Sequence, residues 1–102
     1  MTFTKIENRL LNKIITSNFT KRQLKILLFI IRFSYGLNKT FVFFDKKDFF
    51  YAGIPPYQVE NELKKLLLRG VIKRDQESGT FMLNRKLKEW IDKKYKVDSF
   101  AS

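Results

Sequence analysis

One stretch of the sequence, residues 45–84, restricts the possible folds most strongly, because it places two helical segments before two short β-segments. Residues 45–52 begin with an acidic residue that suits a helix N-terminus, and they predict a short helix. Residues 53–55 contain glycine and proline and predict a turn. Residues 56–69 predict a second helix, since a proline occupies its first position and a glycine follows its end.

The second half of the stretch predicts a β-hairpin. Residues 71–74 and 80–83 are rich in β-forming side chains, and the polar residues 75–79 between them end in glycine. Two helices joined by a tight turn and followed by a hairpin form a winged helix, a module that most often binds double-stranded DNA. The sequence therefore predicts an α+β fold of the winged helix-turn-helix class, with an antiparallel β-hairpin as the wing.

Further segments flank this motif on both sides. Apolar side chains recur at helical spacing in residues 6–15, which predicts an N-terminal helix. Residues 20–23 have the pattern of a capping box and begin a largely apolar helix that extends to about residue 33. Residues 40–44 predict a short strand that pairs with the hairpin. Asn84 is expected to cap an extra C-terminal helix.

The composition favours a polyanionic partner and excludes several kinds of chemistry. Lys and Arg number 21 against 10 Asp and Glu, which gives a net charge of +11. The chain contains no Cys and no His. Disulfides and thiol chemistry are therefore excluded, and the commonest general base and metal ligand are missing. We expect a protein that is not an enzyme and that has no cofactor, no metal site and no small-molecule substrate.

The sequence predicts a single cytoplasmic domain, residues 1–102. The longest apolar run, residues 26–31, is far shorter than the roughly 20 residues that span a bilayer, so we expect no membrane partner. The N-terminus also lacks the pattern of a signal peptide. No internal repeat or linker divides the chain.

Two elements are candidates for contact with DNA. A winged helix usually places the first half of its second helix in the major groove, but here residues 56–62 carry two glutamates and no positive charge. We therefore expect the wing to supply much of the specific contact and the helix to act as a second surface. The candidates on the wing and just after it are Lys73, Arg74, Gln76, Ser78, Gly79, Thr80 and Arg85. The candidates on the second helix and at its end are Gln58, Asn61, Lys64, Lys65 and Arg69.

A cluster of phenylalanines between the central helix and the second helix leaves an alternative open. It consists of Phe41, Phe43, Phe44, Phe49 and Phe50. Such a cluster more often forms core than a stacking platform, whereas a protein that binds RNA or single strands needs exposed aromatic side chains. A basic RNA-binding protein is therefore one alternative, and a winged-helix transcriptional repressor is another.

The terminal helices offer apolar faces that predict a twofold dimer. The candidate interface residues are Ile6, Leu10, Ile14, Leu87, Trp90 and Ile91. The alternative is that both helices only close the core of the monomer.

Several segments together resemble a known family. The most specific is the run Arg32-x-x-Tyr35-Gly36-x-Asn38-Lys39 within residues 31–39, and further matching pieces are residues 3–8, 10–11, 20–27, 52–54, 69–72 and 83–84, with Trp90. From residue 3 to about residue 90 the chain resembles the winged-helix domain at the N-terminus of phage replication protein O and of related replication initiators. The resemblance implies sequence-specific binding to repeated sites in an origin.

In size and character the chain is also similar to small winged-helix accessory proteins of conjugative plasmids, which mark an origin of transfer for the relaxase. The sequence therefore predicts a double-stranded DNA-binding protein of a plasmid or phage. We expect it to bind short repeated sites at an origin of transfer or replication as a dimer. A relaxase or the replication machinery would be its protein partner.

Overall fold

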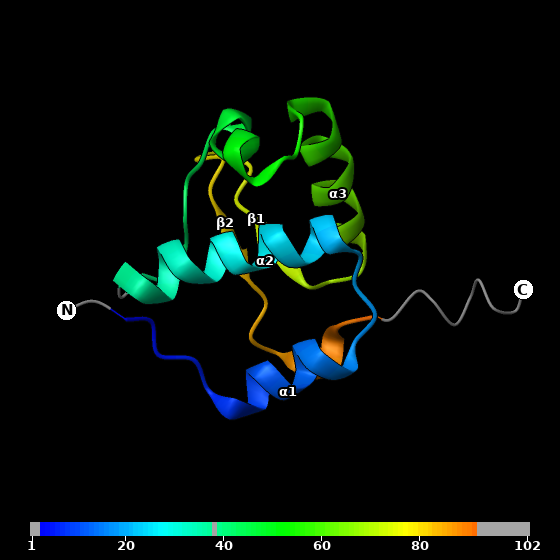
Figure 1. The fold of residues 1–102 in the computed structure, drawn as a ribbon. Helices are drawn as coiled ribbons and strands as arrows, with labels where there is room; N and C mark the ends of the chain where they lie inside the picture. Colours follow the sequence, from blue (N-terminus) through cyan, green and yellow to red (C-terminus); the bar gives the residue numbers. More distant parts are fainter. Residues whose placement is uncertain (1–2, 38, 92–102) are drawn as a thin grey trace, which may run out of the picture.

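The computed structural model describes residues 3–37 and 39–91 of the chain. Its elements are α1 (Asn8–Thr16), α2 (Lys21–Ser34), η1 (Tyr35–Leu37), η2 (Lys46–Ala52), α3 (Pro56–Leu68), β1 (Ile72–Arg74), β2 (Phe81–Leu83) and η3 (Leu87–Glu89), where η marks a 3-10 helix. The two strands pair antiparallel, with Lys73 opposite Met82. This arrangement confirms the predicted α+β winged helix. In Figure 1, α2 crosses the middle of the molecule, with α1 on one side and α3 and the wing on the other.

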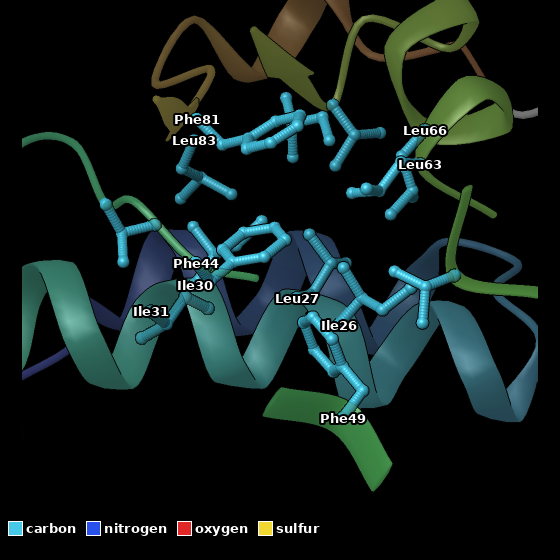
Figure 2. Packing of buried hydrophobic residues seen from close by; sticks show 14 of the residues in the cluster. Ile26, Leu27, Ile30, Ile31, Phe44, Phe49, Leu63, Leu66, Phe81 and Leu83 are labelled. Carbon is cyan, nitrogen blue, oxygen red and sulfur yellow. The ribbon is translucent and has the colours of Figure 1, made fainter. Parts of the chain in front are cut away.

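The core is built on α2, the most deeply buried helix. Its N-terminus has the predicted capping box: the Thr20 hydroxyl accepts from the Gln23 N–H at 3.2 Å, and Gln23 Oε1 accepts from the Thr20 N–H at 3.1 Å. Ile26, Leu27 and Ile30 have no exposed surface. Each such side chain contributes about 1.5–3 kcal/mol by burial. In Figure 2, side chains from α3 and the wing face those of α2 across this core.

Aromatic rings connect η2 and the wing to α2. Phe49 of η2 packs against Phe29 of α2, with ring centroids 4.5 Å apart, and against Phe44 at 5.1 Å. Phe44 in turn stacks on Phe81 of the wing at 4.9 Å. Aromatic pairs at these separations stabilise a fold beyond the effect of their buried area. Phe44 and Phe49 therefore belong to the core, as expected for the phenylalanine cluster, whereas Phe41 and Phe43 of the same cluster are exposed.

The strand predicted for residues 40–44 is present only as an isolated bridge. Val42 pairs antiparallel with Phe81, and the two residues exchange N–H···O bonds of 2.7 and 2.8 Å. The predicted pairing with the hairpin is thus correct, but its length is not. The pairing does not extend toward residue 44 because its partner would be Gly79, whose N–H already donates to the Asp75 carbonyl at 2.8 Å in the turn of the wing.

The predicted C-terminal helix is wrong for the described residues. After Asn84 the chain forms only the 3-10 turn Leu87–Glu89, and Trp90 is extended. Asn84 does not act as a helix cap in this position. Its Nδ2 donates to the Gly70 carbonyl at 2.8 Å and to Glu89 at 3.0 Å, which ties the segment to the end of α3. Residues 92–102, onto which that helix would have continued, lie outside the described residues.

None of the helices in the described ranges is long and apolar enough to cross a membrane.

Gly70 ends α3 in a place that only glycine suits. Its φ is +73°, and a Cβ there would lie 2.9 Å from the Glu89 carbonyl oxygen. Gly53 also has a positive φ, +82°, but nothing lies within 4 Å of the corresponding Cβ position. The two glycines therefore separate the effect of backbone conformation from the effect of crowding.

We expect Gly53→Ala to lower the free energy of unfolding by about 1–2 kcal/mol, the cost of the left-handed conformation for an L-residue. Gly70→Ala should lower it by more, because the new methyl group also collides with a backbone oxygen. Urea unfolding of both variants measures the difference. Equal losses would contradict the close packing of η3 on the end of α3.

Candidate nucleic-acid interface

Helix α3 presents to solvent a stripe of side chains that is basic and polar at its centre, with Tyr57 and Leu68 at its ends. Tyr57, Asn61, Lys64, Lys65 and Leu68 are exposed and recur at the helical period, whereas Val59, Leu63 and Leu66 face the core. The predicted candidates Asn61, Lys64 and Lys65 therefore share one accessible face. Gln58 is partly buried, and its Nε2 lies 3.4 Å from the Tyr57 hydroxyl.

One of the two glutamates in the first half of α3 points inward. Glu62 is only 6% exposed, and its Oε1 accepts from Gln23 Nε2 at 3.2 Å. From the sequence, Glu60 and Glu62 are both expected to be charges that repel DNA. Burial removes Glu62 from the exposed face of α3, so that face is less acidic than the sequence alone indicates.

The wing presents two cations and an ordered polar tip. Lys73 and Arg74 are exposed on β1, and the Arg74 guanidinium lies 5.2 Å from the Phe81 ring centroid, which favours a fixed position. At the tip, the Asp75 carboxylate accepts from the Ser78 hydroxyl at 2.9 Å and from the Glu77 N–H at 3.1 Å. The hydrogen bond from Ser78 is the main reason that the pKa of Asp75 lies below its usual value.

The remaining tip candidates differ in how accessible they are. Gln76 and Ser78 are exposed, whereas Gly79 and Thr80 are half-buried. The Ser78 hydroxyl already bonds Asp75 and lies 2.8 Å from the Thr80 hydroxyl. Gly79 has a φ of +73°, so it allows the tight turn into β2. Among the predicted tip candidates, Gln76 is thus the long and exposed side chain, and the exposed Glu77 lies beside it.

A basic groove, which was not expected from the sequence, lies between α1 and the segment after the wing. Its volume is about 930 Å³, and five cations line it: Arg9, Lys13, Arg85, Lys86 and Lys88. Glu89 is the only carboxylate among its described lining residues. That carboxylate accepts from Asn84, and this bond, followed by the charges of Lys86 and Lys73, holds the pKa of Glu89 below its usual value.

The predicted candidate Arg85 lies just after the wing, is exposed and lines this groove. Its guanidinium lies 4.7 Å from the Tyr35 ring centroid, and it faces α1 across the groove. The four-residue spacing of Arg9 and Lys13 is enough to indicate that α1 has a basic face. That this face meets residues 85–88 follows only from the tertiary fold.

Arg69 is a structural residue, which corrects its predicted role in DNA contact. The side chain is only 4% exposed. Its Nε donates to the Ile91 carbonyl at 2.7 Å, and Nη1 donates to the Asn18 carbonyl at 2.8 Å. The guanidinium also lies 4.3 Å from the Phe19 ring centroid. Arg69 therefore holds the end of α3 against the α1–α2 loop and the C-terminal segment.

The predicted dimer surface is largely used inside the monomer. Leu10 and Trp90 are buried, at 2% and 7% exposure, and the Trp90 Nε1–H donates to the Asn84 carbonyl at 2.9 Å. Ile6, Ile14 and Leu87 are partly buried and pack against the same core. Ile91 is 47% exposed. The proposal of spare apolar faces is therefore wrong for Leu10 and Trp90, which close the monomer core.

Within the described ranges, no group of three or more acidic side chains is placed to hold a metal ion.

Comparison with known proteins gives one family. The family model described as bacteriophage replication protein O matches residues 2–90, which confirms the resemblance inferred from the sequence. No curated protein and no solved structure matches the chain significantly.

Replacing Arg69 should destabilise the fold without a direct effect on DNA contact. We expect Arg69→Met to lower the free energy of unfolding by about 3 kcal/mol, because buried acceptors lose their charged donor. The exposed Lys65 on the same helix is the matched control, and Lys65→Met should change stability by no more than about 0.5 kcal/mol. Urea unfolding measures both. An Arg69→Met variant of normal stability but weakened DNA binding would contradict the structural role.

Proposed function

Because the chain belongs to the bacteriophage replication protein O family, we propose that it binds short repeated sites in double-stranded DNA at an origin of replication. The observation that carries the proposal is a winged helix whose exposed α3 stripe and wing bear four cations: Lys64, Lys65, Lys73 and Arg74. The replication machinery would then be its protein partner. The same contacts would serve a plasmid protein that marks an origin of transfer for a relaxase.

In this proposal α3 and the wing contact the duplex together. Asn61 lies on the exposed stripe, and an asparagine can form two hydrogen bonds with the major-groove edge of adenine. Lys64 and Lys65 follow on the same stripe and suit the flanking phosphates. The wing brings Lys73 and Arg74 to a neighbouring groove, where arginine favours the strong negative potential of a narrow A/T-rich minor groove.

The basic groove supports the proposal from another side of the molecule. Arg9 and Lys13 come from α1, and Arg85, Lys86 and Lys88 come from the segment after the wing. Contacts between cations and phosphates give affinity without sequence preference. We assign this basic groove of the protein to contacts with the phosphates that flank the specific site. These contacts would hold a duplex that bends around the domain.

The contribution of the wing can be separated from that of α3. We expect Lys73→Ala and Arg74→Ala each to weaken binding to an origin repeat by about 1–3 kcal/mol, roughly 5- to 150-fold. Lys5→Ala is the control, since Lys5 is an exposed lysine in the N-terminal segment, which Figure 1 shows across α2 from α3 and the wing. Fluorescence anisotropy with the repeat and with a scrambled duplex measures affinity and specificity.

The opposite pattern would assign recognition to α3 alone. In that case Gln58→Ala and Asn61→Ala would abolish the preference for the repeat, and the wing variants would bind like the unmodified protein. A repeat that binds no better than the scrambled duplex in every variant would remove the proposed function itself.

We also propose that the protein binds paired repeats as a twofold dimer. Since Leu10 and Trp90 lie in the core, the contact would use the exposed apolar side chains Ile15 and Ile91, which are 75% and 47% exposed. We expect Ile15→Asp to convert a dimer to a monomer, because a charge would be buried in the contact. Light scattering with and without duplex measures the mass. A monomeric unmodified protein under both conditions would contradict the dimer.

A further inference from the structure

Two phenylalanines beside the wing are exposed to solvent. Along residues 41–44 the side chains alternate: Val42 and Phe44 are 7% and 8% exposed, whereas Phe41 and Phe43 are 51% and 70% exposed. Burial of a phenylalanine stabilises a fold by about 1.5–3 kcal/mol. The alternation shows that one face of this segment packs into the core, whereas the rings of Phe41 and Phe43 on the other face remain exposed to solvent.

The two rings lie at the edge of the wing. The bridge between Val42 and Phe81 places Phe41 and Phe43 on either side of the paired position, on the outward face of the segment. A Cβ at Gly79 would lie 3.9 Å from Phe43 Cε1, so this ring reaches the wing tip. Met82, which is 38% exposed, lies on the outer face of β2. The result is an apolar aromatic surface next to the proposed DNA contacts.

A hollow of about 380 Å³ continues from these rings toward α2. Phe29 and Phe33 of α2 line it together with Phe41 and Phe43, and Lys39 and Asp48 supply its charged groups. An aromatic wall suits the flat face of a nucleobase, and a lysine suits a phosphate. The Asp48 carboxylate disfavours a phosphate at its own position but can accept from the amino group of a base.

We propose that Phe41 and Phe43 form a stacking site for the unpaired bases of single-stranded DNA. Outward residues two apart on an extended segment are about 6.8 Å apart, roughly twice the 3.4 Å spacing of bases stacked in a duplex. The two rings therefore suit bases that have been separated from one another. Lys39 lines the hollow beside the rings, and Lys73 lies opposite Met82 on the outward face of the wing, so both supply positive charge for the backbone of such a strand.

This site extends the proposed function. It rests on that function only for the source of the single strand, which would come from DNA opened next to the bound duplex. The duplex would be bound through α3 and the wing, and a strand opened next to the site would be held on the outer edge of the same wing. Affinity for a single strand can be measured without any origin sequence. The two proposals therefore fail independently.

The test uses the full chain and a fluorescein-labelled oligothymidine. We expect Phe43→Ala to weaken single-strand binding by about 5- to 150-fold, and Phe41→Ala to have an effect in the same direction. Phe43→Trp should keep the affinity, because tryptophan also stacks. Phe3→Ala is the matched control, since Phe3 is 67% exposed in the N-terminal segment. Urea midpoints should be unchanged, because the rings removed are exposed.

The stacking of a base on Phe43 can be detected separately from binding, by the fluorescence of a base analogue. A 2-aminopurine base in the strand should lose fluorescence on binding the unmodified protein and keep it with Phe43→Ala. Equal effects of Phe43→Ala and Phe3→Ala, or none, would overturn the proposal. So would an equal loss of duplex affinity, which would indicate a wedge between base pairs. Stronger competition by oligouridine than by oligothymidine would assign the surface to RNA, and a change from dimer to monomer in Phe43→Ala would assign it to a second copy of the chain.

Discussion

The buried polar network around Arg69 sets the position of α3, and the proposed DNA surface depends on it. Arg69 bonds the carbonyls of Asn18 and Ile91, and its Nη1 lies 3.4 Å from Gln23 Oε1. Gln23 caps α2 and also donates to Glu62 of α3. A buried charge is tolerated only where its hydrogen bonds are made, so the network admits few arrangements of the two helices. The network therefore fixes the orientation of α3 relative to α2, and with it the direction in which the exposed stripe of α3 faces solvent.

Local sequence patterns correctly predicted helix ends, which depend on interactions between residues close together in the chain. The capping box at Thr20 and Gln23 formed as expected, and Gly70 ends α3 with a positive φ. In place of the C-terminal helix, Asn84 Oδ1 accepts from the Lys86 N–H only two residues on, while Nδ2 ties the segment to the distant Gly70 carbonyl. The strand at residues 40–44 shortened to one bridge because Gly79, the next pairing position on the wing, is bonded to Asp75 in the turn. Both errors come from contacts between segments, which no window of the sequence contains.

The residues of the candidate site also fall into two groups: those that local sequence patterns predict, and those that depend on contacts between distant segments. The sequence identified the cations of the wing and of α3, since they follow from the position of each element. It also counted Arg69 and Glu62 as surface charges, although both are buried and Gln23 lies between them. A charged residue on a helix does not reveal whether a distant partner will bury it. The basic groove was missed for the converse reason, because α1 and residues 85–88 meet only in the folded chain.

The central claim is that this winged helix recognises particular duplex sites. Net charge alone would produce binding that is indifferent to sequence, so affinity for DNA by itself does not test it. Hydroxyl-radical footprinting of the protein on the origin DNA of its own replicon, at physiological salt, tests it directly. The account predicts short protected segments that repeat along the origin while the DNA between them is still cleaved. Uniform protection of all the DNA, or no protection at a protein concentration that shifts the DNA in a gel, would contradict it.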